Sequence, residues 1–573
     1  MPLPRPSAAI AGTRPYTVPR HGAPMDLMLD GIGGLPTPPE LLTEALATLD
    51  PERLVRHYPD TGALRERLAA RHGVAVEQVL VTSGGDDALD RACRALLSSG
   101  RNLVLPVPTF EMLHRYAQWA GAEVRAVDWP GGAYPVDAVL EAVDADTTAI
   151  AVVSPNNPTG QVIRADELRR LAAGAPDAVL LVDLAYVEFA DEDLTEAVLA
   201  LPQALAFRTL SKAWGLAGLR VGYALGPAEL VGWLRTAGNP YTVSAASAAV
   251  ALHRLQGAED EVQAYVARVR AQRDALGDVL AEVGAQPQRS QANFVFARSA
   301  RAGWIRDALA GLGIGVRTWP GHPTLGDAVR VNVPGDEAVM QRLTHALRAA
   351  LAPEALLLDM DGVLADVSGS YRAAILQTAA TFGVTVTSAD VERAKAEGNA
   401  NNDWVLTHRL VLQAGGQATL EAVTARFEEL YQGTPGQPGL RATETLIPAA
   451  STLEALAARL PLAIVTGRPR RDAHAFLEEH GLAHLMRAVV CMEDAPAKPD
   501  PAPVALALAQ LGVGTAWLVG DTPDDVRAAR AAGVVPVGVV APGADPMRAM
   551  GVLTSAGASR VLRHPDALLE LLP

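Results

Sequence analysis

The stretch TLSKAWGLAGLRVGY, residues 209–223, follows the apolar run ALAF, residues 204–207, with only Arg208 between them. An apolar run that ends in a serine–lysine pair and a glycine-rich turn predicts a buried strand with polar side chains at its carboxyl end. Lys212 is one of only three lysines, with Lys395 and Lys498, among the 49 basic residues. A lysine amine can lose its proton and attack a carbonyl, whereas an arginine guanidinium stays protonated. Lys212 is therefore a candidate for covalent chemistry.

Short apolar runs alternate with amphipathic segments rich in Ala, Leu and Arg from about residue 23 to about residue 350. The runs include RNLVLPVP, TTAIAVVSP and AVLLVDLAY, at residues 101–108, 147–155 and 178–186. This alternation predicts an α/β fold with a large, doubly wound and mainly parallel sheet. Residues 1–22 are rich in proline, arginine and small residues and predict an extended N-terminal arm.

A second series of strands and helices begins after Pro353, where a helical pattern passes directly into a buried strand. Its apolar runs ALLLD, LPLAIVTG and TAWLVGD each end in polar residues, as expected at the carboxyl edge of a Rossmann-like parallel sheet. The sequence predicts one domain over residues 23–352 and another over residues 353–573. Helical patterns at about residues 367–455 predict a helical cap inserted into the second domain.

The overall composition excludes several classes of protein. The net charge of −15 argues against binding to nucleic acid, and no apolar run approaches the roughly 18 residues that cross a bilayer. Cys93 and Cys491 are too few for a disulfide framework, and the first residues lack a secretion signal. We expect a soluble, cytoplasmic enzyme with small-molecule substrates.

Four segments of the first domain follow one another in a fixed order: TSGGDDALDRACRALL, SPNNPTG, VLLVDLAY and the lysine segment. Together they resemble the fold-type I aminotransferases, which use pyridoxal phosphate. The resemblance implies that Lys212 is linked to the cofactor and moves a proton between the substrate carbon and the cofactor. It implies that Asp183 keeps the pyridine nitrogen protonated, so that the ring acts as an electron sink. It implies further cofactor contacts from Thr209, Ser211 and Arg220 to the phosphate, and from Asn157 and Tyr186 to the ring hydroxyl.

Other cofactor contacts implied by the resemblance have ordinary structural alternatives. The first amides of a helix at Gly85 and Asp86 can hold a phosphate, although a plain helix cap explains Asp86 or Asp87 equally well. Phe110 matches the aromatic residue that stacks on the pyridine ring, with core packing as the alternative. Tyr58 matches the tyrosine that reaches the cofactor phosphate of a partner subunit, which implies a homodimer.

Within this class, the sequence is most similar to histidinol-phosphate aminotransferases. Tyr16 in RPY, Arg317 in GVR and Arg330 in AVRVNV match positions that bind the substrate's phosphate or carboxylate in that family. Two guanidinium groups near one site suit an anion, whereas a solvated surface position is the alternative for Arg317. DGIGGLP at residues 30–36 replaces the family's Asn-Glu-Asn-Pro, and Leu184 replaces an acidic residue. The first departure leaves the identity of the substrate open.

The second domain begins with LLLDMDGVLAD at residues 356–366, an apolar strand that ends in two aspartates. IVTGR, AKPDPAP and VGDTPDD follow in order, and the set resembles the phosphatases of the haloacid dehalogenase superfamily. The resemblance implies that Asp359 is the nucleophile and that Asp361 is first the acid and then the base. It implies that Thr466 and Lys498 bind the phosphoryl group. It implies magnesium near Asp359, Asp361, Asp521 and Asp525, with Asp524 as an alternative to Asp525.

Two further features of the second domain have open interpretations. Asn399, Asn401 and Asn402 lie in the polar stretch before a cap helix, where they either select the substrate or form turns and helix caps. Arg468, beside the threonine motif, either binds substrate or lies on the surface.

The two resemblances together predict a bifunctional enzyme of histidine biosynthesis. Its cofactors are pyridoxal phosphate and Mg²⁺, and its substrates are histidinol phosphate and glutamate or 2-oxoglutarate. One alternative is a pyridoxal-phosphate decarboxylase of a phosphorylated amino acid, such as threonine phosphate. A second alternative is an aminotransferase of another amino acid fused to a phosphatase of a different ester. A third is a non-catalytic module that binds pyridoxal phosphate.

Overall fold

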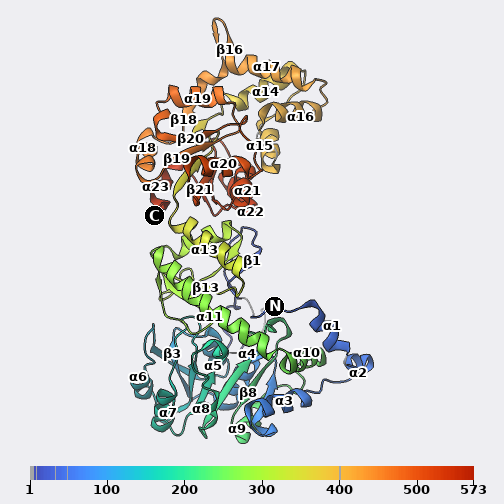
Figure 1. Cartoon of the computed structure of the whole chain (residues 1–573), viewed down its shortest axis with the longest axis vertical. Coiled ribbons are helices and arrows are strands. Elements are labelled where there is room, and N and C mark those ends of the chain that lie inside the picture. Colours follow the sequence, from blue (N-terminus) through green and yellow to red (C-terminus); the bar gives the residue numbers. More distant parts are fainter. Residues whose placement is uncertain (1–5, 8, 32–33, 48, 399–401) are drawn as a thin grey trace. The chain divides into compact units, whose positions relative to one another are not determined.

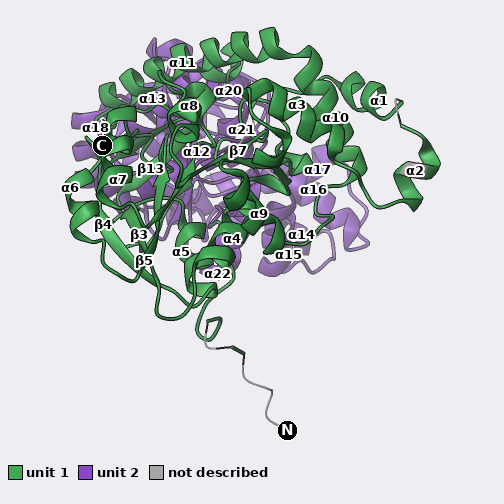
Figure 2. Ribbon diagram, turned by 90° about the horizontal axis from the view of Figure 1, so that it is seen from below, with its two compact units in different colours: residues 1–18, 29–299, 317–340 green, residues 19–28, 300–316, 341–573 purple. Residues whose placement is uncertain are grey.

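The computed structural model describes residues 6–7, 9–31, 34–47, 49–398 and 402–573. The chain forms two compact units, which Figure 2 shows in green and purple. Unit 1 consists of residues 1–18, 29–299 and 317–340, and unit 2 of residues 19–28, 300–316 and 341–573.

A seven-stranded sheet forms the centre of unit 1. Its strand order is β2 (Val79–Thr82), β8 (Gly222–Leu225), β7 (Ala204–Thr209), β6 (Val179–Asp183), β5 (Thr147–Val153), β3 (Asn102–Val107) and β4 (Glu123–Asp128). Strand β8 is antiparallel to both of its neighbours, and all other pairs in the sheet are parallel. The prediction of a mainly parallel sheet is therefore confirmed.

One face of this sheet is buried under α4 (Gly84–Leu96), α5 (Glu111–Trp119) and α9 (Ala228–Thr236), whose apolar side chains share a core with the strands. The strands are short β-branched and leucine-rich runs, and β6 and β7 are buried at every position. Strands covered on both faces have this continuous apolar pattern rather than an alternating one. The other helices of this part of the chain are α1 (Pro39–Ala47), α2 (Pro51–Arg56), α3 (Gly62–His72), α6 (Val136–Glu141), α7 (Ala165–Gly174), α8 (Thr195–Leu199), α10 (Ala245–Gly257) and α11 (Glu259–Glu282).

A smaller antiparallel sheet also belongs to unit 1. Its order is β12 (Arg317–Thr318), β13 (Ala328–Asn332), β10 (Phe294–Arg298) and β9 (Gln286–Pro287). Arg317 and Arg330 are directly opposite each other on neighbouring strands, so the sheet register brings the two arginines together.

A six-stranded parallel sheet forms the centre of unit 2. Its order is β20 (Met486–Val490), β19 (Leu462–Val465), β14 (Ala355–Leu358), β21 (Ala516–Gly520), β22 (Val535–Val539) and β23 (Arg560–Leu562). Helix α18 (Ala450–Arg459) precedes β19, and the helices that follow strands of the sheet are α19 (Arg470–Glu479), α20 (Ala502–Leu511), α21 (Pro523–Ala531), α22 (Pro546–Ala556) and α23 (Leu568–Leu571). All the polar motifs predicted for this domain follow strands β14, β19, β20 and β21, whose carboxyl ends share one edge of the sheet.

Among the described residues, four helices form a cap between the first and second strands of this sheet in sequence (Figure 1). They are α14 (Tyr371–Thr381), α15 (Ser388–Glu397), α16 (Asp403–Gln413) and α17 (Leu420–Gln432). The chain enters the cap through β15 (Ala365–Asp366) and leaves it through β18 (Thr445–Leu446), and these two strands pair with each other. A hairpin of β16 (Gly433–Thr434) and β17 (Gln437–Pro438) projects from the cap in Figure 1.

Unit 2 also contains segments from the predicted first domain, namely β1 (Leu27–Met28), α12 (Ala302–Gly311), β11 (Ile314–Gly315) and most of α13 (Glu337–Leu351). The indole rings of Trp304 in α12 and Trp517 in β21 lie 4.6 Å apart. Their nitrogens donate hydrogen bonds to the carbonyl oxygens of Ala350 and Ala349, at 2.8 and 2.7 Å. These contacts cross the boundary predicted near residue 353, which itself stays a prediction.

Among the described residues, every helix is either too short or too polar to cross a lipid bilayer.

Candidate active sites

Unit 1 contains a cavity of about 1050 Å³ at the carboxyl ends of β5, β6 and β7. Thirteen of the fourteen residues predicted for the first site line it, and Tyr58 is the exception. The lining includes Tyr16, Gly85, Asp86, Phe110, Asn157, Asp183, Tyr186, Thr209, Ser211, Lys212, Arg220, Arg317 and Arg330. Residues up to 314 positions apart in sequence therefore meet around one space.

Asp183 and Lys212 are the two residues of this cavity with the clearest chemical meaning. Asp183 is the last residue of β6, and its side chain accepts a hydrogen bond from the amide of Ala185 at 3.0 Å. Burial raises the pKa of Asp183 to about 7, although this hydrogen bond and the charge of Lys212 favour the ionised form. The amine of Lys212 lies 5.3 Å from the centre of the Tyr186 ring. A cationic partner stabilises the ionised form of a buried carboxyl group of this kind.

Hydroxyl groups and a glycine turn form one end of the cavity. Thr209 donates a hydrogen bond to the hydroxyl of Ser211 at 2.9 Å and accepts one from its amide at 3.1 Å. Gly84 has a φ of +78°, and a Cβ there would lie 2.6 Å from the guanidinium of Arg220. The turn therefore requires glycine, and it leaves the first amides of α4 and the hydroxyl proton of Ser211 available to an anion.

Arg220 and Asp86 form an ion pair of 2.9 Å at the same end. Asp86 therefore does not act as the helix cap that was the alternative for it. Asp87 instead accepts a hydrogen bond from the amide of Ser83. Among the described residues, Arg220 is the only one other than glycine with a positive φ, at 54°. Backbone strain of this kind occurs where a side chain is held in place for function.

Arg317 and Arg330 place two buried guanidinium groups at the cavity. Arg330 donates hydrogen bonds to the side chain of Asn157 at 2.6 Å and to the carbonyl oxygen of Asp30 at 2.7 Å. Its Nε and one terminal nitrogen of Arg317 have no partner among the described residues. Arg317 is only 7% exposed, so the surface alternative for this residue is wrong. Buried N–H groups without partners indicate that the site is built for an anionic ligand.

The remaining predicted residues of the first site differ in their surroundings. Phe110 packs against the apolar core and also lines the cavity, and its stacking on a pyridine ring stays a prediction. Tyr16 is 49% exposed and lies under the guanidinium of Arg115. Tyr58 is 80% exposed, lies outside the cavity and stacks on Tyr241 with the ring centres 4.6 Å apart.

The unusual segment DGIGGLP lies next to the lysine. Asp30 and Gly31 line the cavity, residues 32–33 lie outside the described part, and Gly34 has a φ of +72°. A Cβ at Gly34 would lie 1.3 Å from the carbonyl oxygen of Lys212, so only glycine fits there. The segment that departs from the family pattern therefore supports the backbone of Lys212.

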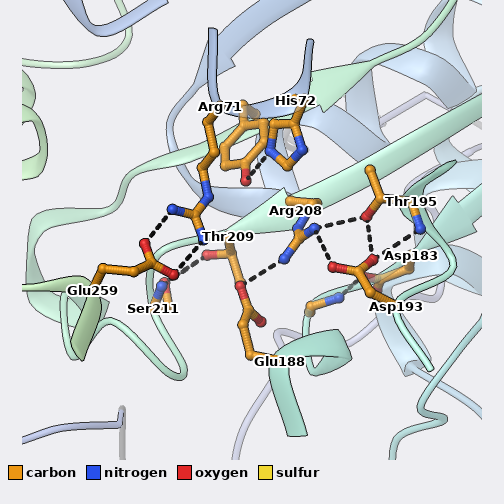
Figure 3. A network of polar contacts seen from close by, with 12 residues as sticks. Arg71, His72, Asp183, Glu188, Asp193, Thr195, Arg208, Thr209, Ser211 and Glu259 are labelled. Carbon is orange, nitrogen blue, oxygen red and sulfur yellow. Dashed lines mark hydrogen bonds and ion pairs between the residues drawn. The ribbon is translucent and has the colours of Figure 1, made fainter. Parts of the chain in front are cut away.

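Arg208 in β7 is the centre of a network of polar contacts, which Figure 3 shows. Arg208 donates hydrogen bonds to Glu188 at 2.8 Å, to Thr195 at 2.7 Å and to Asp193 at 3.1 Å. These partners follow Tyr186 in sequence, so the network ties the loop that carries Tyr186 to the strand that precedes Lys212. The network thereby limits the movement of two cavity residues relative to each other.

Three carboxylates and a lysine meet in unit 2. Oxygens of Asp359, Asp521 and Asp525 all lie within 4.8 Å of one another. Lys498 donates hydrogen bonds to Asp359 at 2.8 Å and to the carbonyl oxygen of Val465 at 3.0 Å, and it also pairs with Asp525. Burial and the neighbouring carboxylates raise the pKa of Asp359 well above its usual range and that of Asp521 to about 7. This concentration of oxygen ligands and negative charge fits a magnesium ion.

Asp361 is not among the three carboxylates of this cluster, and its predicted role as a metal ligand stays a prediction. Its side chain accepts a hydrogen bond from Nε of Arg468 at 2.6 Å. The chain turns directly after Asp361, at Gly362, which has a φ of +74°. Arg468 is 2% exposed, so the alternative of a surface position for it is wrong. Thr466, predicted to bind the phosphoryl group, accepts a hydrogen bond from the amide of Arg468 at 3.1 Å.

The cap contributes charged groups that sequence reasoning missed. Lys395 pairs with Asp403 at 3.4 Å and lines a small cavity of about 80 Å³ together with Arg372 and Asp521. The scarcity of lysine was the one available signal for Lys395. Asn402 caps α16 by accepting a hydrogen bond from the amide of Val405. Its predicted companions Asn399 and Asn401 lie outside the described residues.

The family model for aminotransferase class I and II matches residues 30–347 of this chain. The chain belongs to that family. The model for haloacid dehalogenase-like hydrolases matches residues 353–533, so this aminotransferase carries a hydrolase domain of that family at its C-terminal side. Both predicted resemblances are confirmed.

Curated relatives of this aminotransferase have names from histidine metabolism. Histidinol-phosphate aminotransferase of Paracoccus denitrificans is 34% identical over 314 residues, which are 52% of this chain and 83% of that protein. Imidazoleglycerol-phosphate dehydratase of Phytophthora nicotianae is 49% identical over 230 residues, 38% of this chain and 50% of that protein. Histidinol-phosphate aminotransferase 1 of Bacillus cereus is 39% identical over 222 residues, 38% of this chain and 60% of that protein. The chain spans less than two thirds of the length of these last two relatives.

A solved structure shows the same fold for the aminotransferase part. Histidinol-phosphate aminotransferase from Sinorhizobium meliloti, in complex with pyridoxal 5′-phosphate, aligns with a TM-score of 0.55 and 22% identity. The alignment covers 61% of this chain and 98% of that one. At this identity the likeness concerns the fold.

Proposed function

We propose that this chain is a bifunctional enzyme that uses pyridoxal phosphate and Mg²⁺ at two separate centres. The first centre transfers an amino group between glutamate and a phosphorylated ketone, imidazole-acetol phosphate. The second centre hydrolyses the product, histidinol phosphate. The two reactions would be consecutive steps in the biosynthesis of histidine.

The observation that carries the first half is the meeting of Asp183, Lys212 and two buried arginines around one cavity. When bound, pyridoxal phosphate supplies an electron-poor ring that stabilises negative charge on the substrate carbon. Asp183 would hold the ring nitrogen in its protonated form, which also gives the buried carboxylate its missing cation. Lys212 would link to the cofactor and then carry the proton to and from the substrate carbon.

The phosphate of the cofactor suits the end of the cavity with hydroxyl groups and helix amides. Gly85 and Asp86 would offer backbone N–H groups, while Thr209, Ser211 and Arg220 would contribute side chains. Asn157 and Tyr186 would orient the ring at its hydroxyl group, and Phe110 would stack on it. Each of these residues lines the cavity, which supports the assignment.

The substrate class follows from the two buried guanidinium groups. Histidinol phosphate carries a phosphate, and glutamate carries two carboxylates. Each of these two substrates therefore needs a cationic side chain that binds its anionic group away from the reacting amine. Arg317 and Arg330, with Tyr16 at the entrance, would serve both substrates in turn. By the family pattern, Tyr58 would reach the cofactor phosphate of the partner subunit. Its ring is exposed and stacks on Tyr241 outside the cavity of its own subunit, which supports a homodimer.

The second half rests on the cluster of Asp359, Asp521, Asp525 and Lys498. A Mg²⁺ ion held by the three carboxylates would offset their charge. Asp359 would attack phosphorus, and the bond from phosphorus to the leaving oxygen would break as Asp361 gives that oxygen a proton. Water would then cleave the phosphorylated Asp359 while Asp361 accepts a proton. Thr466 and Lys498 would bind the phosphoryl oxygens.

Histidinol phosphate as the common intermediate is supported by the names of the relatives. Those relatives are called histidinol-phosphate aminotransferase or imidazoleglycerol-phosphate dehydratase. We also place the enzyme in the cytoplasm, in keeping with two unpaired cysteine thiols.

The test uses the full chain loaded with pyridoxal phosphate and Mg²⁺. With histidinol phosphate and 2-oxoglutarate, we expect formation of glutamate, and with histidinol phosphate alone, release of inorganic phosphate. A parallel reaction with threonine phosphate should release no carbon dioxide. Carbon dioxide without any glutamate would identify a decarboxylase instead, and neither product from any substrate would contradict catalysis at the first centre.

A further inference from the structure

Arg468 is a buried residue of unit 2 whose guanidinium contacts two carboxyl groups and an aromatic ring. It is the second residue after Thr466 in the loop that follows β19, and its side chain is 2% exposed. Its Nε donates a hydrogen bond to Asp361 at 2.6 Å, and another guanidinium nitrogen donates one to Glu444 at 2.9 Å. The guanidinium also lies over the ring of Tyr371, 5.0 Å from its centre. The direction of this group is thus fixed on three sides.

Glu444 connects this group to both ends of the cap. It directly precedes β18, the strand through which the chain leaves the cap. One of its oxygens accepts hydrogen bonds from the hydroxyl of Ser370 at 2.8 Å and from that of Tyr431 at 3.0 Å. Ser370 directly precedes α14, the first cap helix, and Tyr431 lies in α17, the last one. Glu444 therefore contacts the entry and the exit of the cap at once.

We propose that Arg468 is a positioning residue that orients the carboxylate of Asp361 for proton transfer and links this orientation to the cap through Glu444. This inference rests on the proposed phosphatase function, in which Asp361 is the acid and then the base. A buried cation needs compensating partners, and Arg468 has two carboxylates as partners. The planar guanidinium gives each hydrogen bond a fixed direction, which the flexible ammonium of a lysine does not.

The basicity of the leaving group determines how strongly hydrolysis depends on the position of Asp361. When Asp359 attacks phosphorus, the electron pair of the broken P–O bond goes to the leaving oxygen, which takes the proton of Asp361. An alkoxide is strongly basic and needs that proton, whereas p-nitrophenolate leaves without it. A misplaced Asp361 therefore slows the hydrolysis of alkyl phosphates more than that of p-nitrophenyl phosphate. This difference between the substrates is measured as kcat/KM, because kcat/KM includes phosphorylation of the enzyme but not the later attack of water.

The experiment compares three variants of the full chain in the presence of Mg²⁺. For Arg468→Lys, we expect kcat/KM to fall at least about tenfold more for histidinol phosphate and glycerol 2-phosphate than for p-nitrophenyl phosphate, since general acid catalysis contributes about 10²–10⁴-fold. Glu444→Gln should show a smaller loss in the same direction. Arg470→Lys is the matched control, since this arginine is half exposed and pairs with Asp494. It should leave kcat/KM for each alkyl phosphate unchanged relative to that for p-nitrophenyl phosphate.

A double substitution separates positioning from general damage to the fold. In the background of Asp361→Asn, Arg468→Lys should cause little further loss on the alkyl esters, because the group that it orients can no longer give a proton. Equal losses on aryl and alkyl esters would overturn the positioning role, and so would full additivity with Asp361→Asn. An unchanged ratio in Glu444→Gln would overturn the link to the cap. If the wild-type chain hydrolyses none of the esters, the proposed phosphatase function itself fails.

Discussion

Asp183→Asn should change how the stability of the cofactor-free protein depends on pH. The carboxyl group of Asp183 has an ordinary pKa of 3.8, and its burial raises this value to about 7. Below pH 3.8 the folded and the unfolded chain both hold the proton. Between pH 3.8 and about 7 only the unfolded chain releases it, so the free energy of unfolding falls as the pH rises. Above pH 7 both states have released the proton, and the loss stays constant.

The size of this effect follows from the two pKa values. At about 1.4 kcal/mol for each pH unit, Asp183 costs the folded state about 1.5 kcal/mol at pH 5 and about 4 kcal/mol at pH 8. Asparagine has a similar shape and does not ionise. The stability of the variant relative to the wild type should therefore rise by about 2.5 kcal/mol from pH 5 to pH 8. Adding pyridoxal phosphate at pH 8 should favour the wild type instead, because its carboxylate then gains a cationic partner.

Hydrogen exchange in increasing urea measures this difference within unit 1. Peptides that contain β5, β6 and β7 report the opening of the large sheet separately from unit 2. Asp137→Asn is the control, because the side chain of Asp137 is 81% exposed and pairs with Arg170 at the surface, and it should show no change between the two pH values. A relative stability of Asp183→Asn that is the same at pH 5 and pH 8 would show that burial does not raise the pKa of this carboxyl group.

Three other predictions concern the lysine loop, the core of unit 2 and the metal. Gly34→Ala should weaken the binding of pyridoxal phosphate at least tenfold in an absorbance titration, because the added Cβ would meet the carbonyl oxygen of Lys212. Gly218→Ala, where the added Cβ would lie in open space, should leave this affinity unchanged. Trp517→Ala should destabilise unit 2 by about 3–5 kcal/mol in urea denaturation, because a fully buried ring and its contact with Trp304 are lost. Removing Mg²⁺ with a chelator should abolish phosphate release but leave glutamate formation unchanged, and added Mg²⁺ should restore the first activity.

The sequence was sufficient to predict features that depend on one short segment. Continuous apolar runs such as those of β6 and β7 predicted buried parallel strands, and polar residues after them predicted the edge with the active sites. The motif around Lys212 was recognisable because a glycine turn and a strand end are local properties of the chain. The confirmed fold class depends on such local patterns.

Contacts between distant segments could not be predicted in this way. Arg468 is 107 residues from Asp361 and 24 from Glu444, and nothing in its own neighbourhood shows that it is buried between them. The close approach of Gly34 to Lys212 likewise joins segments that are far apart in sequence. Each case depends on tertiary packing, which sets the direction of a side chain after the strands and helices have formed.

In the proposed function, one chain contains two independent centres that share histidinol phosphate as a substrate. The most direct measurement follows glutamate and inorganic phosphate separately while the protein acts on histidinol phosphate and 2-oxoglutarate. We expect Lys212→Ala to abolish only the glutamate signal and Asp359→Asn to abolish only the phosphate signal. Loss of both signals from either single substitution would contradict two independent centres.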